Sequence, residues 1–144
     1  MSAPEAADPA AWLPHRPPFL FIDRIVSLTP GERASARLAV SAAAGWMAGR
    51  ERWPATLLLE ALAQTAGLAL RSNVPAGPRL VSRLAAVPRF RMRREVLPGA
   101  RVILHAERLR VHGAFQRFRV HAETDAGRCA EGELVLWSAA PAAD

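Results

Sequence analysis

The longest apolar stretch of the chain, residues 53–73, predicts one long, buried helix. Leucine and alanine occupy most of its positions, and a helix that is apolar nearly all round is a buried helix. Pro54 stands where a first helical residue is expected, because proline at that position has no donor to lose. Thr56, Glu60 and Gln64 recur every four residues, so they form one thin polar stripe on this helix.

Glu60 is the first candidate for a functional residue. An ionised carboxylate on a buried helix is unfavourable by several kcal/mol unless it is paired or protonated. A carboxylate kept at such a position is therefore a candidate for acid or base chemistry. The alternative is a structural glutamate that hydrogen-bonds a neighbouring loop, and the helix pattern alone leaves both interpretations open.

Six further segments predict β-strands, because they alternate apolar and polar positions or are rich in β-forming residues. Two precede the helix and four follow it: residues 19–29, 34–41, 80–87, 101–111, 114–124 and 128–137. Turn-forming residues join neighbouring strands at 30–32, 112–113 and 125–127. A proline-stiffened turn at 13–19 and a loop of small residues at 42–52 complete the predicted order.

This order predicts an α+β fold in which one long central helix is wrapped by a curved, roughly six-stranded antiparallel sheet. We expect a single domain at 12–138, between an N-terminal tail at 1–11 and a C-terminal tail at 139–144. One helix hardly covers such a sheet, so an edge strand stays exposed. A homodimer that joins two sheets edge to edge is the expected solution.

Composition restricts the possibilities further. The chain has 144 residues, enough for one domain with its own core. No apolar run is long enough for a transmembrane helix and no secretory signal is recognisable, so we expect a cytoplasmic protein without a membrane partner. The single cysteine, Cys129, excludes an internal disulfide and is expected to be an inert core thiol.

Basic residues dominate one segment. The net charge is +6 and all nineteen basic residues are arginine, which makes an acidic partner plausible. A phosphate-bearing cofactor and a solvated basic face are alternatives, and no nucleic-acid motif accompanies the segment, so we expect no nucleic-acid partner. Six arginines fall within sixteen residues that contain no acid: Arg79, Arg83, Arg89, Arg91, Arg93 and Arg94.

Three motifs resemble a known family. They are LPHRPPFLFIDR at 13–24, EALAQTAG at 60–67 and RLAAVPRFRMRREVLPG at 83–99. Their order and spacing are similar to those of the hot-dog-fold 3-hydroxyacyl-acyl carrier protein dehydratases of the FabZ type, with FabA as a cousin. The resemblance covers about residues 12–138.

The resemblance implies a substrate and separate catalytic roles for three groups. The substrate would be a 3-hydroxyacyl thioester on an acyl carrier protein, or on coenzyme A, in fatty-acid or polyketide-type biosynthesis. In the family, a histidine before the helix takes the C2 proton, and a helix carboxylate of the other protomer helps the C3 hydroxyl to leave. A backbone N–H at the helix start holds the thioester oxygen. No cofactor is implied, and the four histidines are too scattered in sequence to suggest a metal site.

The motifs carry these roles onto particular residues. Glu60 matches the helix carboxylate and Gln64 the glutamine one turn later. Pro54 matches the proline of the family's Pro-Gly helix entry, and Ala55 replaces the glycine, so the closest backbone approach is lost although the N–H remains. Binding of an acidic carrier protein is expected at the basic segment, through Arg83, Arg89, Arg91, Arg93 and Arg94.

Trp46 is the main departure from the family. The catalytic histidine belongs fourteen residues before Glu60, and Trp46 occupies that position. An indole N–H is only a donor, so Trp46 cannot accept the C2 proton and instead reshapes the substrate pocket. No other histidine is expected to replace the base. His15 is expected to stabilise its turn, and the other three fall on later strands or a hairpin tip, facing solvent or the outer side of the sheet: His105, His112 and His121.

Three functional interpretations follow. The chain is a dehydratase-like enzyme with altered chemistry, or a non-catalytic hot-dog subunit that partners a competent dehydratase, as in aryl polyene-type pathways. The third is an acyl-coenzyme A thioesterase in which Glu60 activates water. Each makes a different prediction for activity and for partners.

Overall fold

A computed structural model describes residues 8–71 and 81–139 of the chain. Two helices, one 3₁₀ turn and six strands make up this part. In chain order they are α1 (Pro9–Trp12), β1 (Arg24–Thr29), β2 (Arg33–Ala39), η1 (Gly45–Met47), α2 (Ala55–Arg71), β3 (Val81–Met92), β4 (Arg101–His112), β5 (Phe115–Thr124) and β6 (Gly127–Ala139). None of the helices in the described ranges is long and apolar enough to span a membrane.

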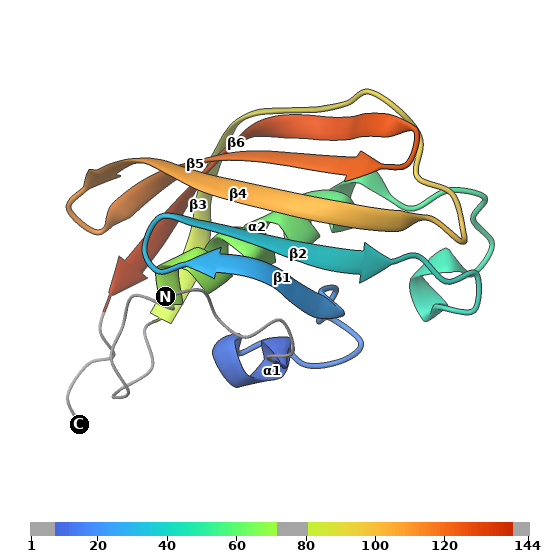
Figure 1. Cartoon of the computed structure of the whole chain (residues 1–144), viewed down its shortest axis with the longest axis horizontal. Helices are drawn as coiled ribbons and strands as arrows, with labels where there is room; N and C mark the ends of the chain where they lie inside the picture. Colours follow the sequence, from blue (N-terminus) through green and yellow to red (C-terminus); the bar gives the residue numbers. More distant parts are fainter. Residues whose placement is uncertain (1–7, 72–80, 140–144) are drawn as a thin grey trace.

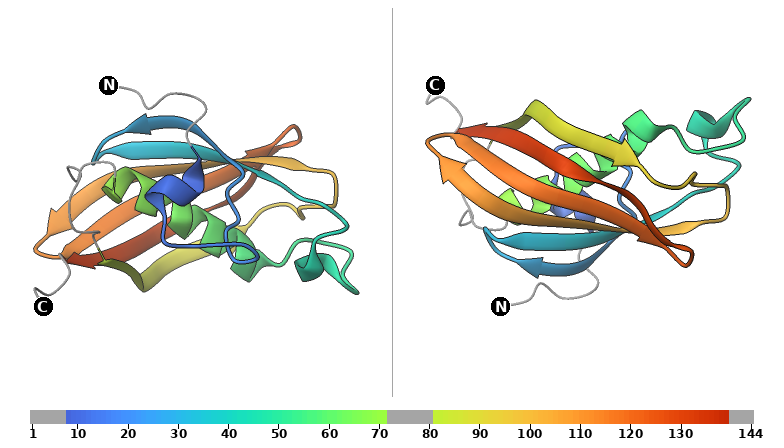
Figure 2. Two further views of the ribbon diagram at one scale, coloured as in Figure 1. Left: turned by 90° about the horizontal axis from the view of Figure 1, so that it is seen from below. Right: turned by 90° about the horizontal axis from the view of Figure 1, so that it is seen from above.

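The six strands form one antiparallel sheet in the order β1-β2-β4-β5-β6-β3. Figure 1 shows α2 running beneath this sheet, and the left view of Figure 2 shows α1 and α2 on its concave side. The predicted α+β architecture, one long helix wrapped by a curved six-stranded sheet, is confirmed.

The core lies between α2 and the concave face of the sheet. Alternate residues of β4 and β5 point toward the helix and are buried, as the period of two requires. The helix is buried continuously from Ala61 to Leu70, because its many alanines let the sheet approach it closely. Cys129 belongs to this core, and burial raises the pKa of its thiol.

Strand β1 begins at Arg24, not at the predicted residue 19. The Asp23 N–H still donates to the Arg37 carbonyl of β2, but the Phe21 N–H donates to the Gln64 side chain on α2, so the chain has left the sheet there. The predicted loop at 42–52 contains the short turn η1. Within the predicted N-terminal tail, the Asp8 carboxylate caps α1, which packs on α2.

Strand β3 runs five residues beyond its predicted end at Val87 and passes through Pro88. Proline is tolerated here because β3 is an edge strand and needs no hydrogen bond on its outer side. Arg89 and Arg91 are therefore strand residues. The predicted helix positions 72 and 73, as well as residue 80 of the predicted strand, lie outside the described residues.

Candidate functional site

Gln64 fastens the N-terminal loop to α2. The side chain is almost fully buried, with 1% of its surface exposed. Its Oε1 accepts the Phe21 N–H at 3.1 Å, and its Nε2 donates to the Phe19 carbonyl at 2.9 Å. The same Nε2 also donates to Glu60 Oε1 at 3.2 Å. Gln64 thus fixes the loop and orients the candidate carboxylate at once.

Glu60 is less buried than the residues that follow it on α2. Its side chain keeps 24% of its surface exposed, because this side of α2 faces a shallow recess. The recess measures about 70 Å³, and Leu13, Gly67 and Leu136 contribute to its walls. Glu60 is therefore held in place by a hydrogen bond and remains accessible, which acid or base chemistry requires.

His15 lies beside Glu60, which the sequence did not indicate. Its Nε2 is 3.4 Å from Glu60 Oε1, and its Nδ1 is buried without a hydrogen-bond partner. The turn that His15 was expected to stabilise is instead held by Arg16, which donates to the carbonyls of Leu13 and His15. The two residues are 45 positions apart in sequence, so no local spacing could have paired them.

Trp46 is fixed as a hydrogen-bond donor. Its Nε1 donates to the Pro18 carbonyl at 2.8 Å. The ring packs against Phe19 and Phe21, with centroid distances of 5.9 and 5.8 Å. Phe21 also contacts the buried Trp53. These contacts make Trp46 part of an aromatic cluster that fills the region where a base is expected.

In the described part of the chain, Trp46 and Glu60 line two different pockets. Trp46 lines an apolar pocket of about 550 Å³ together with Phe21, Leu38 and Trp53. Within residues 8–71 and 81–139, no residue that lines this pocket also lines the Glu60 recess. This separation agrees with the family scheme, in which the two groups of one active site come from different protomers.

The start of α2 forms a second pocket, of about 780 Å³. The helix begins at Ala55, and the Pro54 carbonyl accepts the Leu58 N–H, so Pro54 caps the helix and is not its first residue. The first N–H groups of a helix have no partner within it and carry a partial positive charge. Arg93 and Arg94 also line this pocket, which suits an oxyanion or an anionic group.

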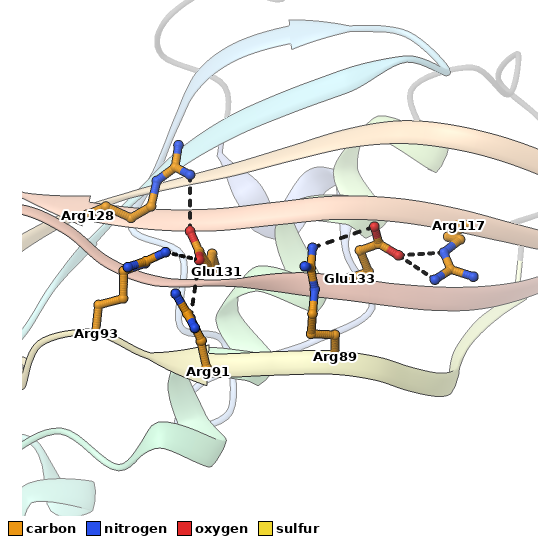
Figure 3. A network of polar contacts seen from close by, with 7 residues as sticks. All are labelled: Arg89, Arg91, Arg93, Arg117, Arg128, Glu131 and Glu133. Atoms are coloured by element: carbon orange, nitrogen blue, oxygen red, sulfur yellow. Dashed lines mark hydrogen bonds and ion pairs between the residues drawn. The ribbon is translucent and has the colours of Figure 1, made fainter.

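The arginines of the basic segment do not form one surface. Arg89, Arg91 and Arg93 follow β3 and reach carboxylates of β6, as Figure 3 shows. Arg83 instead lines the Glu60 recess, and Arg94 lines the pocket at the helix start. Arg79 lies outside the described residues.

Glu131 and Glu133 supply the acid that the basic segment lacks. Glu131 contacts Arg93, Arg91 and Arg128 at 2.5, 3.4 and 3.2 Å. The hydrogen bond from Arg93, above all, lowers the pKa of Glu131 to about 2. Glu133 pairs with Arg117 and Arg89. In this network two carboxylates face five guanidinium groups (Figure 3), so the network carries a net positive charge.

Two of the histidines are not scattered. His105 and His121 face each other on the outer side of β4 and β5, with ring centroids 4.4 Å apart. The outer placement was predicted correctly, but the separation of these histidines in sequence did not indicate that they meet in space. Glu123 joins them, because its Oε1 lies 2.9 Å from His105 Nε2.

Comparison with known proteins identifies the family. Residues 7–143 match the ApeP-like family, described as ApeP dehydratase. The chain belongs to this family. The 3-hydroxyacyl-[acyl-carrier-protein] dehydratase FabZ of Myxococcus xanthus is 40% identical over 128 residues, covering 85% of this chain and 84% of that protein. FabZ of Listeria welshimeri is 33% identical, covering 86% and 88%.

Solved structures confirm the hot-dog fold of this ApeP-like chain. It aligns with the dehydratase heterocomplex ApeI:P from Xenorhabdus doucetiae with a TM-score of 0.78 and 14% identity, covering 94% of this chain and 93% of that one. A hot-dog-like protein from Thermanaerovibrio acidaminovorans aligns with a TM-score of 0.65 and 19% identity, covering 79% and 85%. The chain is thus a FabZ-like, 3-hydroxyacyl-acyl carrier protein dehydratase-like hot-dog protein, while the roles of its site residues stay predictions.

Proposed function

We propose that this chain is an acyl-thioester-binding subunit that supplies Glu60 to a composite dehydratase site, whose base comes from a histidine-bearing hot-dog partner. One observation carries the proposal. Trp46 occupies the position of the family's base, and its only polar hydrogen is donated to the Pro18 carbonyl. The position of Glu60 supports its role as the acid, because Gln64 donates a hydrogen bond to it and it lines an accessible recess.

The chemistry divides between the two chains. The partner's histidine takes the C2 proton of the 3-hydroxyacyl thioester, and negative charge moves onto the thioester oxygen. The Ala55 N–H, at the positive end of α2, stabilises that oxygen. Glu60 gives a proton to the C3 hydroxyl as the C3–O bond breaks, so water leaves and an enoyl thioester remains.

The free edge of β3 supports this arrangement. β3 is the outer strand beyond β6, so its free edge can pair with a second sheet. Val81, Leu84 and Val87 on this strand are exposed apolar residues. The structurally similar ApeI:P is a dehydratase heterocomplex, and a mixed dimer of this chain would contain one complete site. A homodimer, which the sequence predicted, would contain Glu60 twice and no base at position 46.

The substrate is proposed to arrive on an acidic acyl carrier protein. Arg93 and Arg94 flank the pocket at the helix start, and Arg89 and Arg91 extend positive charge along β3. Arg83 lies nearer the Glu60 recess, so it is the least suited of the five to a common docking surface. A cytoplasmic role in fatty-acid or polyketide-type biosynthesis completes the proposal.

The test is co-expression with a histidine-bearing FabZ-type protein, with a different affinity tag on each chain. Tandem purification should recover a mixed dimer that dehydrates a 3-hydroxyacyl-carrier thioester, seen as loss of water by intact mass. Glu60→Gln in this chain should lower the rate at least about 100-fold. Glu32→Gln removes the same charge from an exposed turn residue and should leave the rate unchanged. Full activity of the wild-type chain alone would contradict the proposal.

Thioester hydrolysis is the second candidate, and the contact between His15 and Glu60 favours it. A histidine beside a carboxylate can position and deprotonate water. Hydrolysis of acyl-coenzyme A by the chain alone, abolished by Glu60→Gln, would replace the partner proposal with this one.

A further inference from the structure

Three side chains with metal-binding groups meet on the outer face of the sheet, away from α2. His105 comes from β4, and His121 and Glu123 come from β5. Their neighbours Leu104, Val120 and Ala122 are buried against the helix, so the three face the opposite way. The right view of Figure 2 shows the outer face of these strands, with α2 behind them.

The strand register creates the cluster. His105 is directly opposite His121, and Glu123 follows His121 by two residues on the same face. Directly opposed residues have their Cβ atoms about 5 Å apart, which explains why the two rings stack at 4.4 Å with an interplanar angle of 17°. The backbone of two strands therefore holds the ligands, and no loop has to close over them.

The donor atoms are already close to the spacing that a metal ion needs. His105 Nε2 and Glu123 Oε1 are 2.9 Å apart, and one ligand atom from each residue lies within 4.8 Å of the others. In a tetrahedral zinc site with bonds of about 2.0–2.2 Å, donors are separated by roughly 3.4 Å. Small rotations of half-exposed side chains are enough to reach that geometry.

We propose that His105, His121 and Glu123 form a zinc site on the outer face of the sheet, with water in the remaining position. Two imidazole nitrogens and one carboxylate suit Zn²⁺, whereas Mg²⁺ and Ca²⁺ prefer oxygen ligands alone. The bound ion would join β4 to β5. This site is independent of the dehydratase proposal, because it lies on the other face of the sheet from Glu60.

The surrounding charges act in two directions. Burial first, then His105 and Arg128, lower the pKa of His121, which favours the neutral imidazole that a metal requires. Arg128 also repels a cation, although Glu131 holds its guanidinium at 3.2 Å. His105 and His121 line a hollow to which three further arginines and one further acid contribute, Arg33, Arg89, Arg119 and Glu107.

The proposal is tested by calorimetric titration of tag-free protein with zinc chloride, in buffer containing excess Mg²⁺. We expect one zinc ion per chain. His121→Gln should weaken binding at least about 100-fold, because one of three ligands is lost. Glu123→Gln serves as the second ligand variant, and circular dichroism confirms that both are folded. His112→Gln, an exposed histidine at the end of β4, is the matched control and should bind as the wild type does.

Arg128→Gln gives the proposal a second, opposite prediction. Removing a positive charge that acts on His121 should tighten zinc binding several-fold. Co²⁺ should bind in the same place and show the visible absorption of a tetrahedral site, which His121→Gln abolishes. The proposal is overturned if wild-type protein binds no zinc, or if His121→Gln and Glu123→Gln bind it with wild-type affinity.

Discussion

Replacing Gln64 with leucine tests whether one buried amide holds the N-terminal loop on α2. Leucine keeps the volume but removes the bonds to Phe21, Phe19 and Glu60. The Phe21 N–H would be left buried and unsatisfied, at a cost of about 1–3 kcal/mol. Phe19 is exposed, so its carbonyl can bond water, and the lost bond there is worth about 0.5–1.5 kcal/mol. The expected loss in the free energy of unfolding is roughly 2–4 kcal/mol.

Urea unfolding at one fixed protein concentration measures this loss, because association makes apparent stability concentration-dependent. Thr65→Val is the matched control. Thr65 is equally buried on the same helix, but its hydroxyl only donates to the Ala61 carbonyl, which keeps its backbone partner. We expect Thr65→Val to change stability by less than about 1 kcal/mol. If Gln64→Leu is no more destabilising than Thr65→Val, the amide does not fasten the loop.

Three further predictions concern the sheet. The pKa of Glu131 is lowered to about 2. The ionised Glu131 side chain therefore contributes fully to the stability of the folded protein above its ordinary pKa of 4.5, and this contribution is lost as the pH falls toward 2. Stability should therefore fall less between about pH 5 and pH 2 in Glu131→Gln than in wild type. Urea unfolding measured at a series of pH values in this range tests this. Cys129 should resist thiol reagents until the protein unfolds, because it is buried and its pKa is raised; labelling of native protein would contradict this. Gly132→Ala should destabilise by about 1–3 kcal/mol or more, because its Cβ would lie 2.2 Å from the Arg89 carbonyl oxygen; an unchanged melting temperature would refute the close approach.

The fold and half of the candidate site could be predicted because their signals are local. An apolar helix with a polar stripe placed Glu60 one turn from Gln64, and the structure joins them by a hydrogen bond. The alternating pattern of residues 114–124 predicted the buried face of β5. Such periodic patterns depend only on helix and strand geometry.

The missed features depend on distant contacts. His15 reaches Glu60 only because the loop after it is tied to Gln64. The carboxylate that faces the arginines of β3 comes from β6. The sequence of the basic segment alone therefore predicted more unpaired positive charge than the structure has. Neither contact leaves a pattern in the sequence near the residues that make it.

The histidine pair shows how one irregularity changes a surface. Counting from the hairpin pair of His112 and Phe115, a regular ladder would place Ala106 opposite His121. The register shifts by one residue between Arg108 and Arg110, which brings His105 opposite His121 instead. A shift of one residue exchanges the two faces of a strand. The local composition did not predict this shift.

The most direct test of the central claim uses a partner that retains its catalytic histidine but has its helix acid changed to the matching amide. Such a partner has no acid of its own, so any dehydration by the mixed dimer must use Glu60. Our account predicts that adding this chain restores formation of the enoyl thioester and that the Glu60→Gln chain does not. A mixed dimer that forms but stays inactive, or is equally active with Glu60→Gln, would show that Glu60 is not the acid of a composite site.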